Sequence, residues 1–200
     1  MTDLPRLVVL ISGSGTNLQA ILDACQTGYL KMQVAAVIAN QPDAFGLERA
    51  RRAGIPAILK TTPTGIDPSA RKAARKAYDT ELAELAAQYK PDWIVLAGWM
   101  RLLSAAFLDQ FPGRVINLHP ALPGTFPGTH AIERAFAAFQ RGEIVNTGVM
   151  VHLVPDEGVD SGPVLAQEIV PILPDDTLDI LEKRVHQVEH ALLVSTLSKL

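Results

Sequence analysis

The chain has 200 residues, of which 48% are hydrophobic and 20% are charged, a composition typical of a globular protein with a substantial core. Its net charge of -3 argues against a protein whose affinity comes from neutralising nucleic-acid phosphates, because such domains are typically basic. A single cysteine excludes an intramolecular disulfide and, without a secretory signal or an apolar run of about 20 residues, predicts a cytoplasmic protein with no membrane partner.

The first predicted element is a strand at residues 7–11, which form a continuous apolar run of strand length. A helix should follow, because Leu18, Ile21, Leu22 and Cys25 recur at helical spacing. This spacing also places Cys25 on the apolar face of the helix. We therefore expect a buried thiol and not a nucleophile.

Residues 12–17, Ser-Gly-Ser-Gly-Thr-Asn, form a glycine loop between this strand and this helix. Backbone N–H groups and the helix dipole favour an anion at such a place. The loop lacks the GxxxxGK[ST] pattern, and Leu18 stands where a dinucleotide site has its third glycine. Two interpretations stay open: a site for one monophosphate, or a tight turn with Ser14 or Thr16 as the helix N-cap.

Strands and helices alternate over the middle of the chain. The patterns predict strands at 34–39, 55–59 and 93–97, and helices at 45–53, about 69–89 and 105–111. Alternation of this kind is typical of an α/β fold with a mostly parallel twisted sheet and helices on both faces.

A strand at 115–118 introduces the most informative residues. Asn117 and His119 are two positions apart, so on an extended strand both side chains point to one face. Asp160 lies much later, in a turn-rich segment from which a loop can return over the strand end. An amide donor, an imidazole and a carboxylate together indicate acyl transfer, although each residue alone is more often structural.

The order of elements changes after a predicted helix at 130–139. Strands at 148–154 and 164–172 have no helix between them, so this end of the sheet should be antiparallel. Asp176 and Thr177 should cap a last helix. We expect a single domain, with a phosphate-binding half at about 1–100 and a catalytic half at about 100–200.

The last helix also contains His186-Gln187-Val188-Glu189-His190, which matches the HxxEH pattern of some zinc proteases. A catalytic zinc site needs a third protein ligand, and only ten residues follow His190. We therefore expect helix-surface or substrate-contact roles for these side chains and no metal.

Four ordered segments, residues 11–20, 96–103, 117–120 and 156–163, resemble the phosphoribosylglycinamide formyltransferase family of folate-dependent enzymes. The resemblance runs over essentially the whole chain. It implies a Rossmann-like formyltransferase fold. It also implies an enzyme that transfers the formyl group of 10-formyltetrahydrofolate to the amine of 5'-phosphoribosylglycinamide in purine biosynthesis. The implied partners are thus small molecules, and monomer and homodimer stay open.

The resemblance also implies roles for individual residues. Asn117 and His119 would stabilise the oxyanion, with His119 as an imidazolium, and Asp160 would support that charge and proton transfer. The implied contacts to the phosphate-bearing substrate are Gly15, Thr16, Asn17 and Glu189. Those to the formyl donor are Arg75, Met100, Arg101, Leu102, Leu103 and Asn117, an apolar run with arginine that suits a flat heterocycle with an acidic tail.

Three departures from the family pattern affect the surroundings of the site. Residues 121–125 replace a common Leu-Leu-Pro sequence, Pro155 looks like an extra residue, and His186 stands where some relatives have glutamine. None removes a predicted catalytic residue. The alternatives are a 10-formyltetrahydrofolate hydrolase, in which water replaces the amine, and a non-catalytic sensor of nucleotide monophosphates that uses only the glycine loop.

Overall fold

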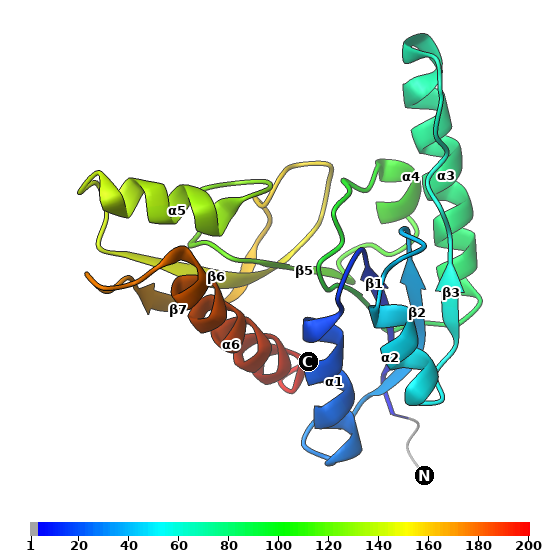
Figure 1. Cartoon of the computed structure of the whole chain (residues 1–200). Helices are drawn as coiled ribbons and strands as arrows, with labels where there is room; N and C mark the ends of the chain where they lie inside the picture. Colours follow the sequence, from blue (N-terminus) through cyan, green and yellow to red (C-terminus); the bar gives the residue numbers. More distant parts are fainter. Residues whose placement is uncertain (1–3) are drawn as a thin grey trace.

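The computed structural model describes residues 4–200 and contains one seven-stranded sheet with helices on both faces (Figure 1). The strand order is β3-β2-β1-β4-β5-β6-β7. The first five strands of this order are parallel, and β6 and β7 continue the sheet in antiparallel pairing. The strands are β1 Arg6–Ile11, β2 Gln33–Ala39, β3 Ala57–Leu59, β4 Trp93–Leu96, β5 Val115–His119, β6 Asn146–Leu153 and β7 Val164–Pro171.

Two groups of helices cover the two faces. Side chains from α1, α2, α5 and α6 pack into one apolar cluster, and those from α3 and α4 pack into the other. The helices are α1 Thr16–Gln26, α2 Gly46–Arg52, α3 Arg71–Ala87, α4 Ala105–Leu108, α5 Ala131–Gln140 and α6 Leu178–Leu197, and a 3₁₀ turn, Pro68–Ala70, precedes α3.

The central strand β1 shows why the sequence folds in this way. Leu7, Val9 and Ile11 face one cluster, whereas Val8 and Leu10 face the other, and all five are fully buried. Successive side chains of a strand point to opposite faces, so an uninterrupted apolar run suits a strand covered on both sides.

The chain reverses its direction across the sheet between β1 and β4. From β1 it proceeds outward to β2 and β3, and then returns to β4 on the other side of β1. In open α/β sheets, ligands bind at the carboxyl ends of the strands beside such a switch point. Here the loops after β1 and β4 are joined, because the Ser12 N–H donates to the Gly98 carbonyl at 3.0 Å.

The predicted fold class is confirmed, including the antiparallel end of the sheet. The boundaries differ where local chemistry intervenes. The strand predicted at 55–59 begins at Ala57, since Pro56 has no N–H to donate. The helix predicted at 69–89 begins at Arg71, after the 3₁₀ turn, and ends at Ala87, and α4 ends at Leu108 instead of residue 111. Within residues 4–200, no helix combines the length and apolar character needed to cross a membrane.

Candidate active site

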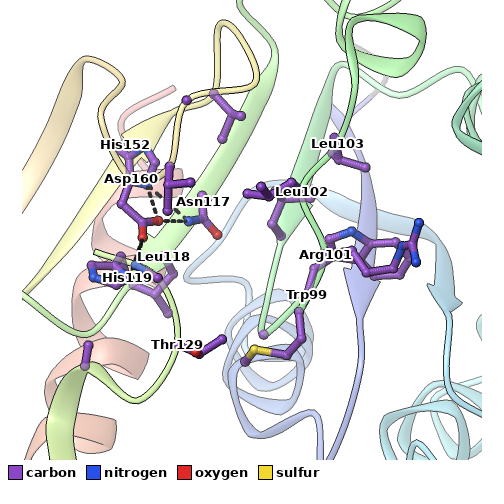
Figure 2. Close-up of a pocket in the computed structure, with 18 of the residues that line it drawn as sticks. Trp99, Arg101, Leu102, Leu103, Asn117, Leu118, His119, Thr129, His152 and Asp160 are labelled. Atoms are coloured by element: carbon purple, nitrogen blue, oxygen red, sulfur yellow. Dashed lines mark hydrogen bonds and ion pairs between the residues drawn. The ribbon is translucent and has the colours of Figure 1, made fainter. Parts of the chain in front are cut away.

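A cleft of about 720 Å³ opens beside β5 at the carboxyl edge of the sheet (Figure 2). One wall carries Asn117 and His119 from β5, together with Asp160 from the loop between β6 and β7. The segment after β4 forms the facing wall. Its lining residues are Gly98, Trp99, Met100, Arg101, Leu102 and Leu103.

Strand β5 places Asn117 and His119 on the same side, as their spacing predicts, and both line the cleft. Pairing with β6 sets Asn117 opposite His152 and His119 opposite Met150. Only 4% of His119 is exposed. The imidazole is therefore largely removed from water.

The loop between β6 and β7 brings Asp160 onto this pair. Its carboxylate accepts hydrogen bonds from Asn117 Nδ2 at 3.1 Å and from the Gly128 N–H at 2.8 Å, and it lies 3.3 Å from His119 Nδ1. Burial raises the pKa of Asp160, but the Gly128 N–H and the neighbouring rings of His152 and His119 bring the pKa below its ordinary value. Several donors thus converge on one oxygen-borne negative charge.

The surroundings of His119 act in opposite directions on its pKa. Both ring nitrogens face acceptors, because Nδ1 faces Asp160 and Nε2 lies 3.1 Å from the Phe126 carbonyl oxygen. These two contacts raise the pKa of His119, but burial outweighs them and sets the pKa below its ordinary value. The contacts with Asp160 and Phe126 thus favour the charged form of His119, and desolvation opposes it.

His152 completes the group, and the sequence reasoning missed it. Its Nδ1 lies 2.8 Å from the Leu153 carbonyl oxygen, so Nδ1 carries the proton and Nε2 accepts from Asn117 Nδ2 at 3.1 Å. Both amide hydrogens of Asn117 are therefore engaged, one by Asp160 and one by His152. Antiparallel pairing of the two strands sets His152 of β6 opposite Asn117. The sequence predicted two such strands but not their register.

The predicted donor-binding residues are divided between the cleft and its surroundings. Met100 and Leu102 are exposed and Leu103 is buried, and all three line the cleft. Arg101 also lines the cleft, but its side chain extends away from the catalytic group (Figure 2). Arg75 does not line the cleft, and its Nη2 lies 3.1 Å from Oε2 of Glu157, which does.

The glycine loop adopts a conformation that depends on glycine. Gly15 is the N-cap of α1 with φ of 71°, and no side chain caps the helix. Neither Ser14 nor Thr16 is therefore the N-cap. A Cβ on Gly15 would lie 2.6 Å from the Gly46 Cα, and the Gly46 N–H donates to the Gly13 carbonyl at 3.1 Å. The start of α2 therefore packs against the glycine loop.

Arg49 on α2 is a second residue that the sequence reasoning missed. Its Nε donates to the Ser14 carbonyl at 2.8 Å, and its Nη1 donates to Gln19 Oε1 at 3.0 Å. The guanidinium thus fixes the glycine loop against the first turn of α1 and brings a positive charge to it. Arg49 lies 35 residues after Ser14 in the sequence, so no local pattern indicated this contact.

The residues predicted to contact the phosphate-bearing substrate, Gly15, Thr16, Asn17 and Glu189, lie outside the lining of the cleft. Glu189 is 4% exposed and accepts from His186 Nδ1 at 2.5 Å, a contact that raises the pKa of His186. In residues 4–200, no group of three or more histidine, cysteine or acidic side chains is arranged to hold a metal ion.

The two loops that are expected to depart from the family pattern are held by their own local contacts. In residues 121–125, both the N–H and the hydroxyl of Thr125 donate to the Leu122 carbonyl, at 3.0 and 2.7 Å. Pro155 packs against Gly162, where a Cβ would lie 2.8 Å from the proline Cδ and 1.9 Å from the Leu153 carbonyl oxygen. Pro155 is therefore accommodated by a glycine two residues after Asp160.

Comparison with known proteins identifies relatives over nearly the full length of the chain. Residues 5–197 match the formyl transferase family. The phosphoribosylglycinamide formyltransferase of Schizosaccharomyces pombe is 48% identical over 97% of this chain and 96% of its own. That of Dictyostelium discoideum is 46% identical over 98% and 97%. The crystal structure of phosphoribosylglycinamide formyltransferase from Bacillus halodurans has a TM-score of 0.86 at 39% identity, over 97% of this chain and 94% of the other.

Proposed function

The chain belongs to the formyl transferase family, and from this premise we propose that it carries formyl from 10-formyltetrahydrofolate to the amine of 5'-phosphoribosylglycinamide. It is a folate-dependent formyltransferase of purine biosynthesis. One observation carries the assignment of the reacting site: Asn117, His119 and Gly128 direct their donors at a single carboxylate, that of Asp160. Donors arranged in this way also suit the oxyanion of formyl transfer.

The proposed reaction begins with attack of the substrate amine on the formyl carbon. A C–N bond forms, and negative charge develops on the formyl oxygen as the carbon becomes tetrahedral. Asn117 Nδ2 and His119 donate to this oxygen. For each of the two side chains, the formyl oxygen replaces one of the acceptors that it faces in the structure. The bond from the formyl carbon to the folate nitrogen then breaks.

Asp160 has two tasks in this scheme. Its negative charge raises the pKa of His119 against the effect of burial, so the imidazole gains a proton more readily as negative charge develops beside it. The carboxylate also accepts the proton that the attacking amine loses and passes it, directly or through water, to the departing folate nitrogen. Atoms and charge balance without a metal or a covalent enzyme intermediate.

The formyl donor is proposed to lie against the segment after β4. Met100 and Leu102 offer exposed apolar side chains to its flat ring system, and Leu103 supports them from the core. The acidic tail is proposed to run toward Arg101, whose side chain extends away from the catalytic group, and toward Arg75, which lines a second cavity together with Arg101. This division separates ring recognition from charge recognition.

The amine substrate is proposed to place its phosphate on the glycine loop. Gly15, Thr16 and Asn17 provide backbone N–H groups at the start of the 11-residue helix α1. Glu189 would contact the same substrate from α6, which packs against α1. The Met100 N–H donates to Ser12 Oγ at 2.9 Å, so the glycine loop adjoins the wall of the cleft.

The test is to follow loss of the formyl group from 10-formyltetrahydrofolate with and without glycinamide ribonucleotide. We expect consumption of the donor to depend on the amine and to yield the formylated amide in equal amount. Equal consumption without the amine would identify a hydrolase. Binding of the ribonucleotide with no turnover of folate would identify a sensor.

A further inference from the structure

The segment that leads into α5 reaches the catalytic group through its backbone. Residues 126–130, which we call the bridging loop, directly precede this helix. The Phe126 carbonyl oxygen lies 3.1 Å from His119 Nε2, and the Gly128 N–H donates to Asp160 Oδ2 at 2.8 Å. The shape of the bridging loop therefore sets the surroundings of both the imidazole and the carboxylate.

The bridging loop has a backbone conformation that most residues avoid. Within residues 4–200, four residues other than glycine have a positive φ, and two of them, Phe126 at 45° and His130 at 58°, begin and end this loop. A third is Asp160, at 50°. A positive φ is unfavourable for an L-residue and is rare for a bulky one such as phenylalanine. It persists only where surrounding contacts hold it, so we looked for the groups that hold the bridging loop.

Arg134, in the first turn of α5, makes these contacts. Its Nη2 donates to the Phe126 and Pro127 carbonyls, at 2.7 and 2.6 Å, and its Nε donates to the His130 carbonyl at 3.3 Å. Its guanidinium carbon also lies 6.0 Å from the centre of the Phe126 ring. Hydrogen bonds from a charged donor are stronger than those between neutral groups. One side chain thus fastens three carbonyls of the bridging loop.

Arg134 reaches the catalytic group only through a shared acceptor. Its side chain is exposed and does not line the cleft. The Phe126 oxygen that accepts from Arg134 is the same oxygen that faces His119 Nε2. With this oxygen held at Nε2, the other ring nitrogen, Nδ1, faces Asp160 at 3.3 Å.

We propose that Arg134 is a positioning residue for formyl transfer, which holds the bridging loop in its left-handed conformation. The Phe126 carbonyl then orients the His119 ring, and the Gly128 N–H orients Asp160. This inference deepens the proposed function and rests on it, because it concerns the group that is proposed to stabilise the oxyanion.

The first test is Arg134→Met, which keeps an unbranched side chain but removes the charge and all three hydrogen bonds. We expect kcat to fall about tenfold to a hundredfold, since a shift of about 1 Å in a catalytic group can cost about 10²-fold in rate. KM for each substrate should stay within about threefold of its original value. Arg141→Met is the matched control and should leave kcat unchanged, because Arg141 is the exposed C-cap of the same helix and bonds Glu143.

A double-variant cycle separates positioning from a general effect on stability. If Arg134 acts mainly through His119, Arg134→Met should lower kcat by about threefold or less when residue 119 is already alanine. A purely structural role would produce the same fall in both backgrounds. Equal falls, or a kcat of Arg134→Met close to that of Arg141→Met, would overturn the proposal.

Phe126→Gly tests the role of the backbone conformation. Glycine adopts a positive φ as readily as a negative one. In the Arg134→Met background, this change should therefore raise kcat about threefold toward the value of the unaltered enzyme. A further fall in kcat would overturn the proposal, because it would show that Arg134 does not act by holding this conformation.

Arg134→Lys keeps the proposal falsifiable if Arg134→Met fails to fold. Lysine retains the charge but loses the planar fork of the guanidinium, so kcat should fall about threefold to tenfold. An unchanged kcat would overturn the proposal.

The charge of Arg134 offers a competing explanation. Burial is the main cause that lowers the pKa of His119, and the charge of Arg134 lowers it further. If this charge were the main influence of Arg134, its removal would favour the imidazolium and kcat would rise in Arg134→Met. Such a rise would overturn the proposal.

A measurement without turnover distinguishes this inference from the proposed function. The NMR resonance of His119 Nε2 should shift in Arg134→Met, because the Phe126 carbonyl moves, and should stay unchanged in Arg141→Met. An unchanged resonance in both variants would overturn the proposal. Absence of formyl transfer by the unaltered protein would instead contradict the proposed function.

Discussion

The glycine loop lies next to the cleft at the carboxyl edge of the sheet, but the two regions present different chemical groups. The loop is contiguous and presents mainly backbone, supported by the packing of Gly15 on Gly46. The catalytic group of the cleft presents side chains from β5, β6 and the segment before β7, which are distant in sequence.

This difference separates binding from chemistry. Backbone N–H groups offer an anion several donors at fixed positions but cannot be titrated, so a loop of this kind suits recognition of a phosphate. Imidazole and carboxylate groups exchange protons, so their cluster suits the reacting atoms. Changes in the loop should therefore act on KM for the amine, and changes in the catalytic group should act on kcat.

The largest effect is expected from His119→Ala. Loss of one donor to an oxyanion typically lowers the rate about 10²–10³-fold, and kcat should fall by that amount. KM for the amine should change little, because the glycine loop is untouched. Steady-state kinetics with both substrates varied would measure the two constants. Turnover within about threefold of the unaltered enzyme would refute the assignment of His119.

Gly15→Ala should show the opposite pattern. An added Cβ would lie 2.6 Å from the Gly46 Cα, and the positive φ of Gly15 costs an L-residue roughly 1–2 kcal/mol. We expect the free energy of unfolding to fall by at least that amount and KM for the amine to rise about tenfold, with a smaller change in kcat.

Gly13→Ala is the matched control for Gly15→Ala. No atom lies within 4 Å of a Cβ added at Gly13, and its φ is not positive. The variant should unfold at nearly the same urea concentration as the unaltered protein. Equal destabilisation of the two variants would show that the close approach of Gly15 to Gly46 is not what shapes the loop.

The contrast between the two regions also explains what the sequence could predict. The parallel sheet followed from apolar runs such as that of β1, and the pairing of Asn117 with His119 followed from the period of a strand. The contacts of His152 with Asn117 and of Arg49 with Ser14 depend on strand register and on helix packing. Neither is encoded by a local pattern, so both were missed.

The sequence could anticipate only one of the two opposing effects on the pKa of His119. A neighbouring Asp160 favours the imidazolium, and this effect could be anticipated from the motif alone. The opposing effect of burial depends on everything that covers the ring, which the sequence near His119 does not specify.

Arg49→Ala should weaken the amine substrate more modestly than Gly15→Ala. The loop conformation is retained by Gly15 and Gly46, but the bond to the Ser14 carbonyl and a positive charge are lost. We expect KM for the amine to rise about threefold to tenfold with kcat nearly unchanged. Arg52→Ala is the matched control, because Arg52 is exposed and bonds Glu48 at 2.9 Å. Equal effects of the two variants would indicate a general loss of charge.

Asp160→Asn should produce a further decrease in the pKa of His119, measured by NMR titration of the imidazole. Burial already holds this pKa below its ordinary value of 6.5, and the charge of Asp160 opposes that decrease. An unfolded chain therefore takes up the proton first as pH falls below 6.5, and His119 reduces stability progressively until its folded pKa is reached. In the variant this loss should continue to a lower pH, which urea unfolding at a series of pH values would detect. An increase in the pKa of His119 would contradict the role of Asp160. If the carboxylate stabilises the imidazolium, its removal can only lower this pKa.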